Sequence, residues 1–335
     1  MQYRILGKTG LKVSAVGFGG IPIQRIDARG TRALMERLVE KGVNYIDTRA
    51  ATLCRRAIWA RHCPAVCGRS SFLQRNPCPA VTRTWRGDIG ISLSNLRTDY
   101  IDLYQLHNIK SDADFELAFS AEGAVAAIQD AIRAGKVGHL GATAHSVDSF
   151  ERLLSYPEIE TIMFPYNIVE SQGEALMERA AAQNVITMKP LAGGNITDGT
   201  LAMRYILQNK TCTLAIPGMA TLEEIEQNTA AAEQDGPLTP EELAACEAIR
   251  AGLSGNFCRR CGYCAPCTVG IDIPGIFTLE NYLKHYDLAD WARSRYESQT
   301  AKRGDCIGCG KCEARCPYEL PIREKLKGVA KAFGA

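Results

Sequence analysis

Short runs of apolar residues alternate with helical periodicity from Val13 to about Ala232. This alternation is typical of βαβ units, whose parallel strands are buried on both faces. Strands are expected at residues 14–19, 44–48, 100–107, 137–143, 161–166, 185–190 and 212–217. Amphipathic helices are expected at residues 31–41, 123–134, 147–155, 174–183, 199–208 and 222–232. The pattern predicts an α/β fold with a parallel sheet.

Closure of these units into a (β/α)8 TIM barrel requires an eighth strand between Thr48 and Asp88. Residues 49–86 show no clear period, and they contain four cysteines and eight arginines but no Asp, Glu or Lys. We therefore expect the region of the third barrel strand to be disrupted. Strands 44–48 and 100–107 would then lack the neighbour between them. An alternative is a metal knuckle, although no paired C-x2-C spacing is present; its ligands would be Cys54, His62, Cys63, Cys67 and Cys78.

The composition changes after the last βα unit. Thr239 and Pro240 are typical of an N-cap and a first helical position, and they predict a short helix. We expect a barrel over residues 1–235, a linker helix over 236–256, and a small, mainly α-helical module over 257–335.

Eight of the fourteen cysteines lie in that last module at metal-ligand spacing. The second run has the C-x2-C-x2-C-x3-C-P spacing of bacterial ferredoxins, and the first run nearly repeats it. In two-cluster ferredoxins the last cysteine of one run completes the other cluster. The spacing predicts two [4Fe-4S] clusters, one held by Cys258, Cys261, Cys264 and Cys316, the other by Cys306, Cys309, Cys312 and Cys267. Two structural zinc sites are the alternative.

The net charge of the chain limits the classes of partner that it can bind. Lys and Arg total 39 against 37 for Asp and Glu, a formal net charge of +2. This balance provides no strong field for nucleic acid or an anionic membrane. The charged first residues differ from a secretory signal, and no apolar run is long enough to cross a membrane. We expect a cytoplasmic protein whose partners are a small molecule and a redox protein. We expect no binding to nucleic acid or to a membrane.

Four segments together resemble the aldo-keto reductase family. They are YRILGKTGLKVSAVGFGG (3–20), NYIDT (44–48), NLRTDYIDLYQLHN (95–108) and IPGMATLEEIEQN (216–228). The cysteine runs resemble those of the subgroup with a C-terminal two-cluster ferredoxin-type domain. The resemblance implies reduction of a small carbonyl substrate by hydride from a nicotinamide cofactor. It also implies catalytic roles for Asp47 and His107, and cofactor binding by Thr143, Asn167, Lys189, Gly193, Gly194, Ile216, Gly218 and Asn228.

The chain departs from the family where protons are handled. Thr52 stands where the family has a Tyr, and residues 49–86 contain no Lys where the family has one. Near the expected adenosine 2′-phosphate the chain has Gly218, Met219 and Glu224, and a carboxylate would repel a phosphate. The departures predict NADH rather than NADPH, and impaired catalysis. The alternative function is a non-catalytic iron-sulfur electron-transfer protein.

The codons of residues 49–86 allow a second reading that is one base out of frame. It permits Gly-Tyr-Thr-Val-Ser-Glu over residues 50–56 and Arg-Glu-Lys-Phe-Phe-Leu-Ala-Thr-Lys-Ser-Met over residues 67–78. This reading restores the Tyr, the Lys and a strand together. We hypothesise that the segment is a frameshift, which resequencing would test.

Overall fold

A computed structural model of the chain describes residues 1–49, 66–70, 85–107, 109, 111–180, 185–234, 236–253, 256–260, 262–316 and 318–334. The chain forms two compact units. The first contains Met1–Leu191 and Asp198–Leu238, and the second contains Ala192–Thr197 and Thr239–Ala335. The chain thus contributes one short loop to the second unit before it returns to the first.

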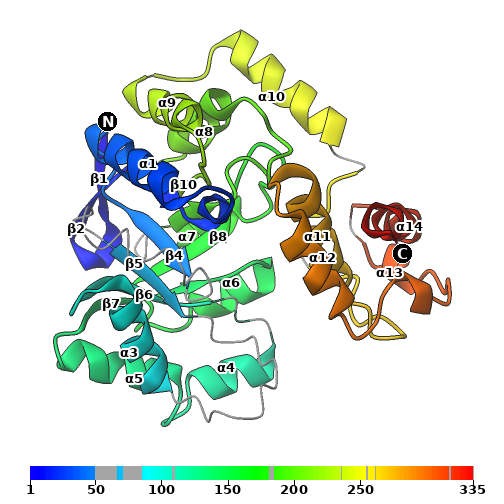
Figure 1. The fold of residues 1–335 in the computed structure, drawn as a ribbon, viewed down its shortest axis with the longest axis horizontal. Helices are drawn as coiled ribbons and strands as arrows, with labels where there is room; N and C mark the ends of the chain where they lie inside the picture. Colours follow the sequence, from blue (N-terminus) through cyan, green and yellow to red (C-terminus); the bar gives the residue numbers. More distant parts are fainter. Residues whose placement is uncertain are drawn as a thin grey trace. The chain divides into compact units, whose positions relative to one another are not determined.

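A sheet of eight strands, in the order β10-β9-β8-β7-β6-β5-β4-β3, forms the centre of the first unit (Figure 1). Each neighbouring pair is parallel. The bounds are β3 (Phe18–Gly19), β4 (Ile46–Arg49), β5 (Val66–Ser70), β6 (Ile101–Leu106), β7 (Val137–Thr143), β8 (Thr161–Pro165), β9 (Val185–Met188) and β10 (Cys212–Ile216). The predicted parallel α/β fold is confirmed.

Backbone hydrogen bonds join the two edges of this sheet into a barrel. The amides of Gly17 and Gly19 donate to the carbonyls of Ala215 and Pro217, both at 2.8 Å. A Cβ atom at Gly19 would lie 3.0 Å from the carbonyl oxygen of Ile216, a tight contact with backbone that favours glycine at this seam. Closure of this kind removes the exposed edges that an open sheet would have.

The expectation of a disrupted third strand is wrong for the backbone. β5 lies between β4 and β6, and it pairs with both in parallel. The strands β4 and β6 each present a row of backbone donors and acceptors toward this position, and any short extended segment can pair with them whatever its side-chain period. Of the suggested metal knuckle, Cys67 lies on β5, and the other members lie outside the described residues.

Helices surround the barrel strands in the first unit (Figure 1). Their sequences supply their own N-caps: Asp27 accepts a 2.7 Å hydrogen bond from the Gly30 amide, and Asp198 accepts one of 2.9 Å from the Leu201 amide. The bounds are α1 (Ala28–Glu40), α3 (Trp85–Leu96), α4 (Asp112–Ala118), α5 (Ala124–Arg133), α6 (Val147–Leu153), α7 (Glu174–Arg179), α8 (Gly199–Gln208) and α9 (Leu222–Ala230).

A hairpin of β1 (Tyr3–Leu6) and β2 (Leu11–Ser14) precedes the barrel. Leu6 and Val13 of this hairpin belong to the same buried cluster as side chains of the barrel strands, among them Leu103, Met163 and Leu214. The hairpin therefore extends the barrel's apolar core.

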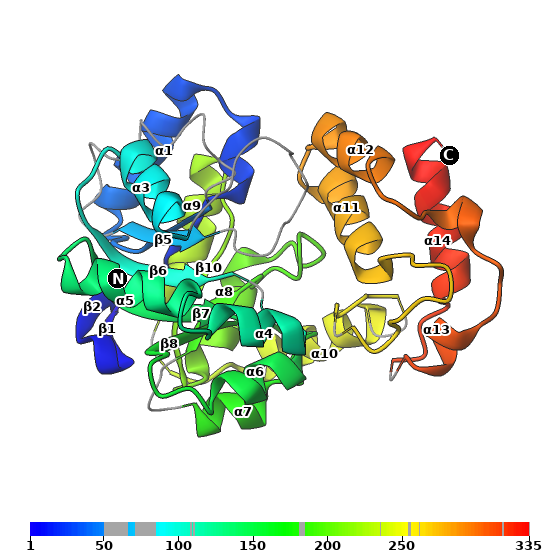
Figure 2. The same cartoon turned by 90° about the horizontal axis from the view of Figure 1, so that it is seen from below.

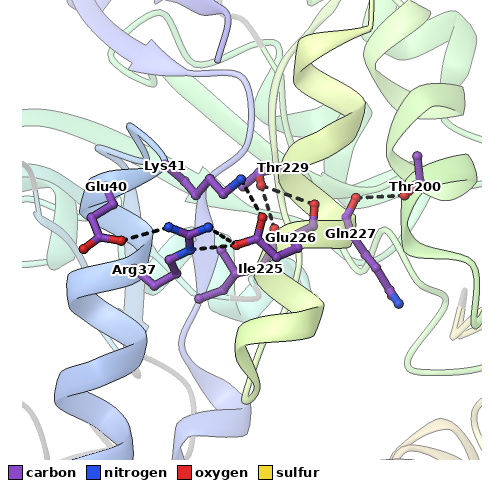
Figure 3. A network of polar contacts seen from close by, with 8 residues as sticks. All are labelled: Arg37, Glu40, Lys41, Thr200, Ile225, Glu226, Gln227 and Thr229. Atoms are coloured by element: carbon purple, nitrogen blue, oxygen red, sulfur yellow. Dashed lines mark hydrogen bonds and ion pairs between the residues drawn. The ribbon is translucent and has the colours of Figure 1, made fainter.

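The first and last helices of the barrel are linked by ion pairs, drawn in Figure 3. Glu226 of α9 lies 2.5 Å from Arg37 Nη2 of α1 and 2.5 Å from Lys41 Nζ. Hydrogen bonding to Lys41, followed by that to Arg37, holds the pKa of Glu226 below its usual value. This network connects two helices that are nearly 200 residues apart in sequence.

The second unit is mainly α-helical, as predicted. Its helices are α10 (Pro240–Leu253), α11 (Ile273–His285), α12 (Ala289–Glu297), α13 (Lys311–Ala314) and α14 (Ile322–Phe333). Figure 2 shows α11 beside α12. The rings of Tyr296 and Phe333 stack at 4.3 Å and join α12 to α14. No helix in the described part of the chain is long and apolar enough to span a membrane.

Candidate functional site

Four polar residues follow consecutive strands at the C-terminal end of the barrel. His107 comes directly after β6 and Lys189 directly after β9, whereas His145 and Asn167 each come two residues after β7 and β8. Parallel strands end at the same face of a barrel, and active sites of such barrels lie at this face. The four side chains therefore mark the functional end of the first unit.

Direct contacts join three of these side chains. Lys189 Nζ lies 3.0 Å from His145 Nδ1. The ring of His145 meets the ring of His107 edge to face, with centroids 6.2 Å apart. Each of the three is partly accessible to solvent. The barrel end thus carries a basic cluster of His107, His145 and Lys189.

Asn167 is hydrogen-bonded to the backbone of this cluster. Its Nδ2 donates to the Lys189 carbonyl at 3.0 Å and to Glu170 Oε2 at 2.8 Å. Its Oδ1 accepts from the amides of Val169 and Glu170, both at 2.9 Å. A side-chain amide has two donors and two lone pairs, and all four are used here. In this arrangement all the hydrogen-bonding groups of the Asn167 amide are used within the protein, and its expected cofactor contact stays a prediction.

Asp47 lies on β4 and is buried, with 8% of its surface exposed. Its backbone carbonyl accepts a 3.0 Å hydrogen bond from Gly20. The position of the missing family Tyr, Thr52, lies outside the described residues, as does residue 75, near the position of the missing Lys. The structure places Asp47 in the barrel, two strands from the one that ends at His107.

Three of the expected cofactor residues lie at the end of β10, in the loop that follows it and in α9; they are Ile216, Gly218 and Asn228. A Cβ atom at Gly218 would lie 2.7 Å from Pro22 Cγ, so a side chain would collide there. Asn228 is 1% exposed; its Nδ2 donates to the Glu224 carbonyl at 2.6 Å, and its Oδ1 has no hydrogen-bond partner among the described residues. Ile216 is buried at the end of β10.

The side chain of Glu224 takes part in capping the N-terminus of α9. Its Oε2 accepts hydrogen bonds from the amides of Ala220 and Thr221, at 2.5 and 3.0 Å, while Thr221 caps the Glu224 amide. This reciprocal capping box uses backbone donors that could otherwise bind a phosphate. The Glu224 carboxylate thus repels an anion at this position and also occupies the backbone amides that would otherwise bind the anion.

The remaining cofactor candidates divide between the two units. Thr143 is buried at the end of β7 in the first unit. Gly193 and Gly194 belong to the second unit, where ideal Cβ atoms would lie 3.3 Å from Asn281 and 2.8 Å from His285 of α11. The structure therefore groups these two glycines with α11 rather than with the strand ends.

The cysteines of the second unit line two separate cavities. The first cavity is lined by Cys267, Cys306, Cys309 and Cys312, together with Ile273 and Leu326 among others. The second cavity is lined by Cys258, Cys264 and Cys316. Cys261 lies outside the described residues. Each cavity thus contains the last cysteine of the opposite run, the same crosswise grouping that the spacing predicts.

The backbone around the second run turns as its glycines suggest. Gly308 and Gly310 have φ values of +71° and +73°, and Gly262 in the first run has +89°. This left-handed region favours glycine. The Thr268 hydroxyl lies 3.4 Å from Cys309 Sγ, and this contact, followed by the Lys311 amide, lowers the pKa of the Cys309 thiol. A lower pKa favours the thiolate, which is the form that binds metal.

Arg315 connects the two cysteine runs. Its Nη1 donates to the Ala265 carbonyl at 2.8 Å and its Nη2 to the Pro266 carbonyl at 3.0 Å, about 50 residues earlier in the chain. No group of three or more His, Cys, Asp or Glu side chains within the described ranges is placed to hold one metal ion. The cysteines instead surround cavities with apolar walls, a setting that fits a four-iron, four-sulfur cluster.

Sequence reasoning did not identify His145. The signal was present, because a polar residue follows the predicted strand 137–143 at the barrel end where such residues are functional. Only its contact with Lys189 distinguishes it from an ordinary residue at the end of a strand.

Two family models match the chain in separate regions. A model described as the aldo/keto reductase family matches residues 82–200, and one described as a 4Fe-4S dicluster domain matches residues 257–321. Both agree with the motifs in the sequence.

Individual relatives agree with these matches. The chain is 25% identical over 306 residues to an L-galactose dehydrogenase of Arabidopsis thaliana, a match that covers 74% of this chain and 94% of the relative. It is 24% identical to an uncharacterised oxidoreductase of Schizosaccharomyces pombe, in a match that covers 66% of this chain and 82% of the relative. The holo form of a Bacillus halodurans aldo-keto reductase has a TM-score of 0.62 at 20% identity, with 74% and 96% covered, and this likeness shows the fold.

Proposed function

We propose that this chain, which carries an aldo/keto reductase domain followed by a C-terminal 4Fe-4S dicluster domain, is an NADH-dependent oxidoreductase that reduces a small carbonyl substrate. Aldo-keto reductases act on carbonyl compounds, so the class of reaction follows from the first domain.

The crosswise grouping of cysteines around two cavities carries the proposal. Four thiolates around an apolar cavity suit a cubane, in which each cysteine binds a different iron. When bound, such clusters supply one-electron transfer. We assign one cluster to Cys258, Cys261, Cys264 and Cys316, and the other to Cys267, Cys306, Cys309 and Cys312. The zinc alternative predicts a colourless protein.

The barrel residues support a nicotinamide with an unmodified ribose. The unpartnered Oδ1 of buried Asn228 is available to accept a donor from the adenine end of a dinucleotide. The capping box of Glu224 fills the amides at the N-terminus of α9, which a 2′-phosphate would need. NADH therefore suits this chain better than NADPH.

The activity of the chain is expected to be low. No Tyr and no Lys occur in residues 49–86, so the family's proton donor and its partner are missing. General acid catalysis typically contributes about 10²- to 10⁴-fold to a rate. Replacement of the segment by its shifted-frame reading should raise the rate by about this factor.

A non-catalytic electron carrier is the second candidate, favoured by the same missing residues. In that case the second unit exchanges electrons with a redox partner protein, and the barrel does no chemistry. Both candidates place the protein in the cytoplasm, where cysteines remain reduced.

One experiment separates the two functions. Anaerobically purified protein, with and without the shifted-frame segment, is assayed with NADH or NADPH against a panel of aldehydes, and with aldoses in the oxidising direction because one relative is named a galactose dehydrogenase. NADH-dependent turnover that rises with the restored segment supports the enzyme. Absence of turnover in both proteins, with both clusters intact, would overturn it.

A further inference from the structure

We propose that Lys189 and His145 form a proton-delivery pair in which the Lys189 ammonium is the proton source and the His145 imidazole relays the proton to the substrate oxygen. This rests on the proposed carbonyl reduction. It gives Lys189 a role different from the cofactor contact expected from sequence. It also gives a function to a histidine that no motif identifies.

The hydrogen bond between Lys189 and His145 has one favoured direction. Lys189 Nζ and His145 Nδ1 are 3.0 Å apart. An ammonium has donors only, so Nδ1 must accept and the imidazole proton must lie on Nε2. The reverse arrangement, a neutral lysine beside a charged histidine, is disfavoured because the reference pKa of lysine is about 4 units higher. His145 is therefore a neutral donor whose second nitrogen is hydrogen-bonded to a cation.

The fold holds this pair in place. Lys189 has a φ of +57°, a conformation that residues with a side chain rarely adopt and that often accompanies function. The buried amide of Asn167 holds the Lys189 carbonyl at 3.0 Å. On the other side, Ser146 caps α6 directly after His145 by accepting from the Ser149 amide at 3.2 Å. Both members are thus positioned by their own backbone.

The imidazole ring of His107 neighbours that of His145. The centroids of His107 and His145 are 6.2 Å apart at an interplanar angle of 71°. Two imidazole N–H groups at this separation can reach one oxygen atom between them, since each hydrogen bond spans about 2.9 Å. His107 would then polarise a carbonyl oxygen while His145 donates the proton to it.

The reaction balances with these groups. A reduced nicotinamide, when bound, would supply the hydride, with its two electrons, that the carbonyl carbon accepts. As the C=O π bond breaks, the oxygen takes the proton from His145 Nε2, and Nδ1 takes a proton from Lys189. The product is an alcohol, and Lys189 is left as a neutral amine. Lys189 is partly exposed, so water can protonate it again before the next turnover.

Substitution of Lys189 by arginine is the sharpest test. Arginine keeps the positive charge that would hold a phosphate, but it does not release its proton near neutral pH. Lys189→Arg should therefore lower kcat about 100-fold or more and leave the KM for NADH within about twofold. Lys189→Met and His145→Gln should lower kcat similarly. A Lys189→Arg enzyme that keeps its kcat would overturn the proposal, as would Lys189→Met raising only the KM for NADH.

His139→Gln is the matched control. His139 lies on β7, the strand that precedes His145. Its Nδ1 pairs with Glu160 Oε2 at 2.8 Å, away from the C-terminal end of the strand. This substitution should leave kcat unchanged. An equal loss in His139→Gln would show that the effects reflect damage to β7, and would count against the relay.

A second readout does not depend on turnover. The chain has five histidines, so ¹⁵N-labelled imidazoles can be assigned by substitution. The His145 signals should show a proton on Nε2 and an accepting Nδ1, and this pattern should vanish in Lys189→Met. A proton on Nδ1 in the unaltered protein would refute the pair. If the protein shows no carbonyl reduction at all, the proposed function fails, whereas the imidazole signals still decide the geometry of the pair.

Discussion

Removal of Arg315 should speed the loss of clusters from the second unit. Arg315 donates two hydrogen bonds to the carbonyls of Ala265 and Pro266, which directly precede Cys267. Cys267 and Cys312 line one cavity but come from different runs. Arg315→Ala therefore releases the first run from the second next to a proposed cluster.

The size of the effect follows from these two bonds. Hydrogen bonds from a charged donor contribute about 1.5–3 kcal/mol each when buried. These bonds are solvent-exposed, and ion pairs at such positions typically contribute about 0.2–1 kcal/mol. Two such bonds together should contribute about 0.4–2 kcal/mol. Since 1.4 kcal/mol corresponds to tenfold, clusters should be lost about 2- to 30-fold faster.

The assay follows the visible absorbance of anaerobically purified protein after addition of excess chelator. Arg293→Ala is the control, because Arg293 donates one hydrogen bond to the Phe333 carbonyl at 3.3 Å in the same unit without lining a described cysteine cavity. Arg315→Lys should fall between the unaltered protein and Arg315→Ala. If Arg315→Ala loses its clusters no faster than Arg293→Ala, the proposed link between the runs is refuted.

Three further outcomes are expected. Anaerobically purified protein should contain about eight irons, and Cys309→Ala should retain about half of them; two zinc ions per chain and no colour would contradict the cluster assignment. Asp47→Ala should change carbonyl reduction little in this chain, whose family Lys is missing, but should lower kcat by orders of magnitude with the shifted-frame segment restored; steady-state kinetics of both backgrounds would show whether the two losses differ. Glu226, whose pKa is lowered by Lys41 and Arg37, should stabilise the barrel above its unfolded pKa and lose this effect as the pH falls through its lower folded pKa. Thermal unfolding of Glu226→Gln against pH should therefore show a deficit near neutral pH that shrinks in acid, and a constant deficit would contradict the ion-pair explanation.

Patterns over short stretches predicted most of the elements. β7 occupies residues 137–143 as expected, and β8, β9 and β10 differ from prediction by only one or two residues at their ends. Local chemistry was equally informative at the cysteines, because ligand spacing depends on a few consecutive residues. The turn glycines of the cysteine runs adopt positive φ for the same local reason.

Predictions that required long-range pairing were weaker. β5 was missed because its backbone pairs with β4 and β6 whatever its side-chain pattern. The hydrogen bond of Asn167 to the Lys189 carbonyl, 22 residues away, likewise depends on the pairing of the strands and could not be read from the sequence. Gly193 and Gly194 follow a barrel strand in sequence, yet they pack with α11.

The sequence alone determined the class of fold, the two-part organisation and the cysteines expected to hold clusters, since periodicity and ligand spacing are properties of neighbouring residues. Only the tertiary structure decided which side chains meet at the end of the barrel. His145 and Lys189 are 44 residues apart, and each alone is an ordinary polar residue after a strand. They meet because β7, β8 and β9 lie side by side and end at one face, an arrangement set by backbone pairing and barrel closure.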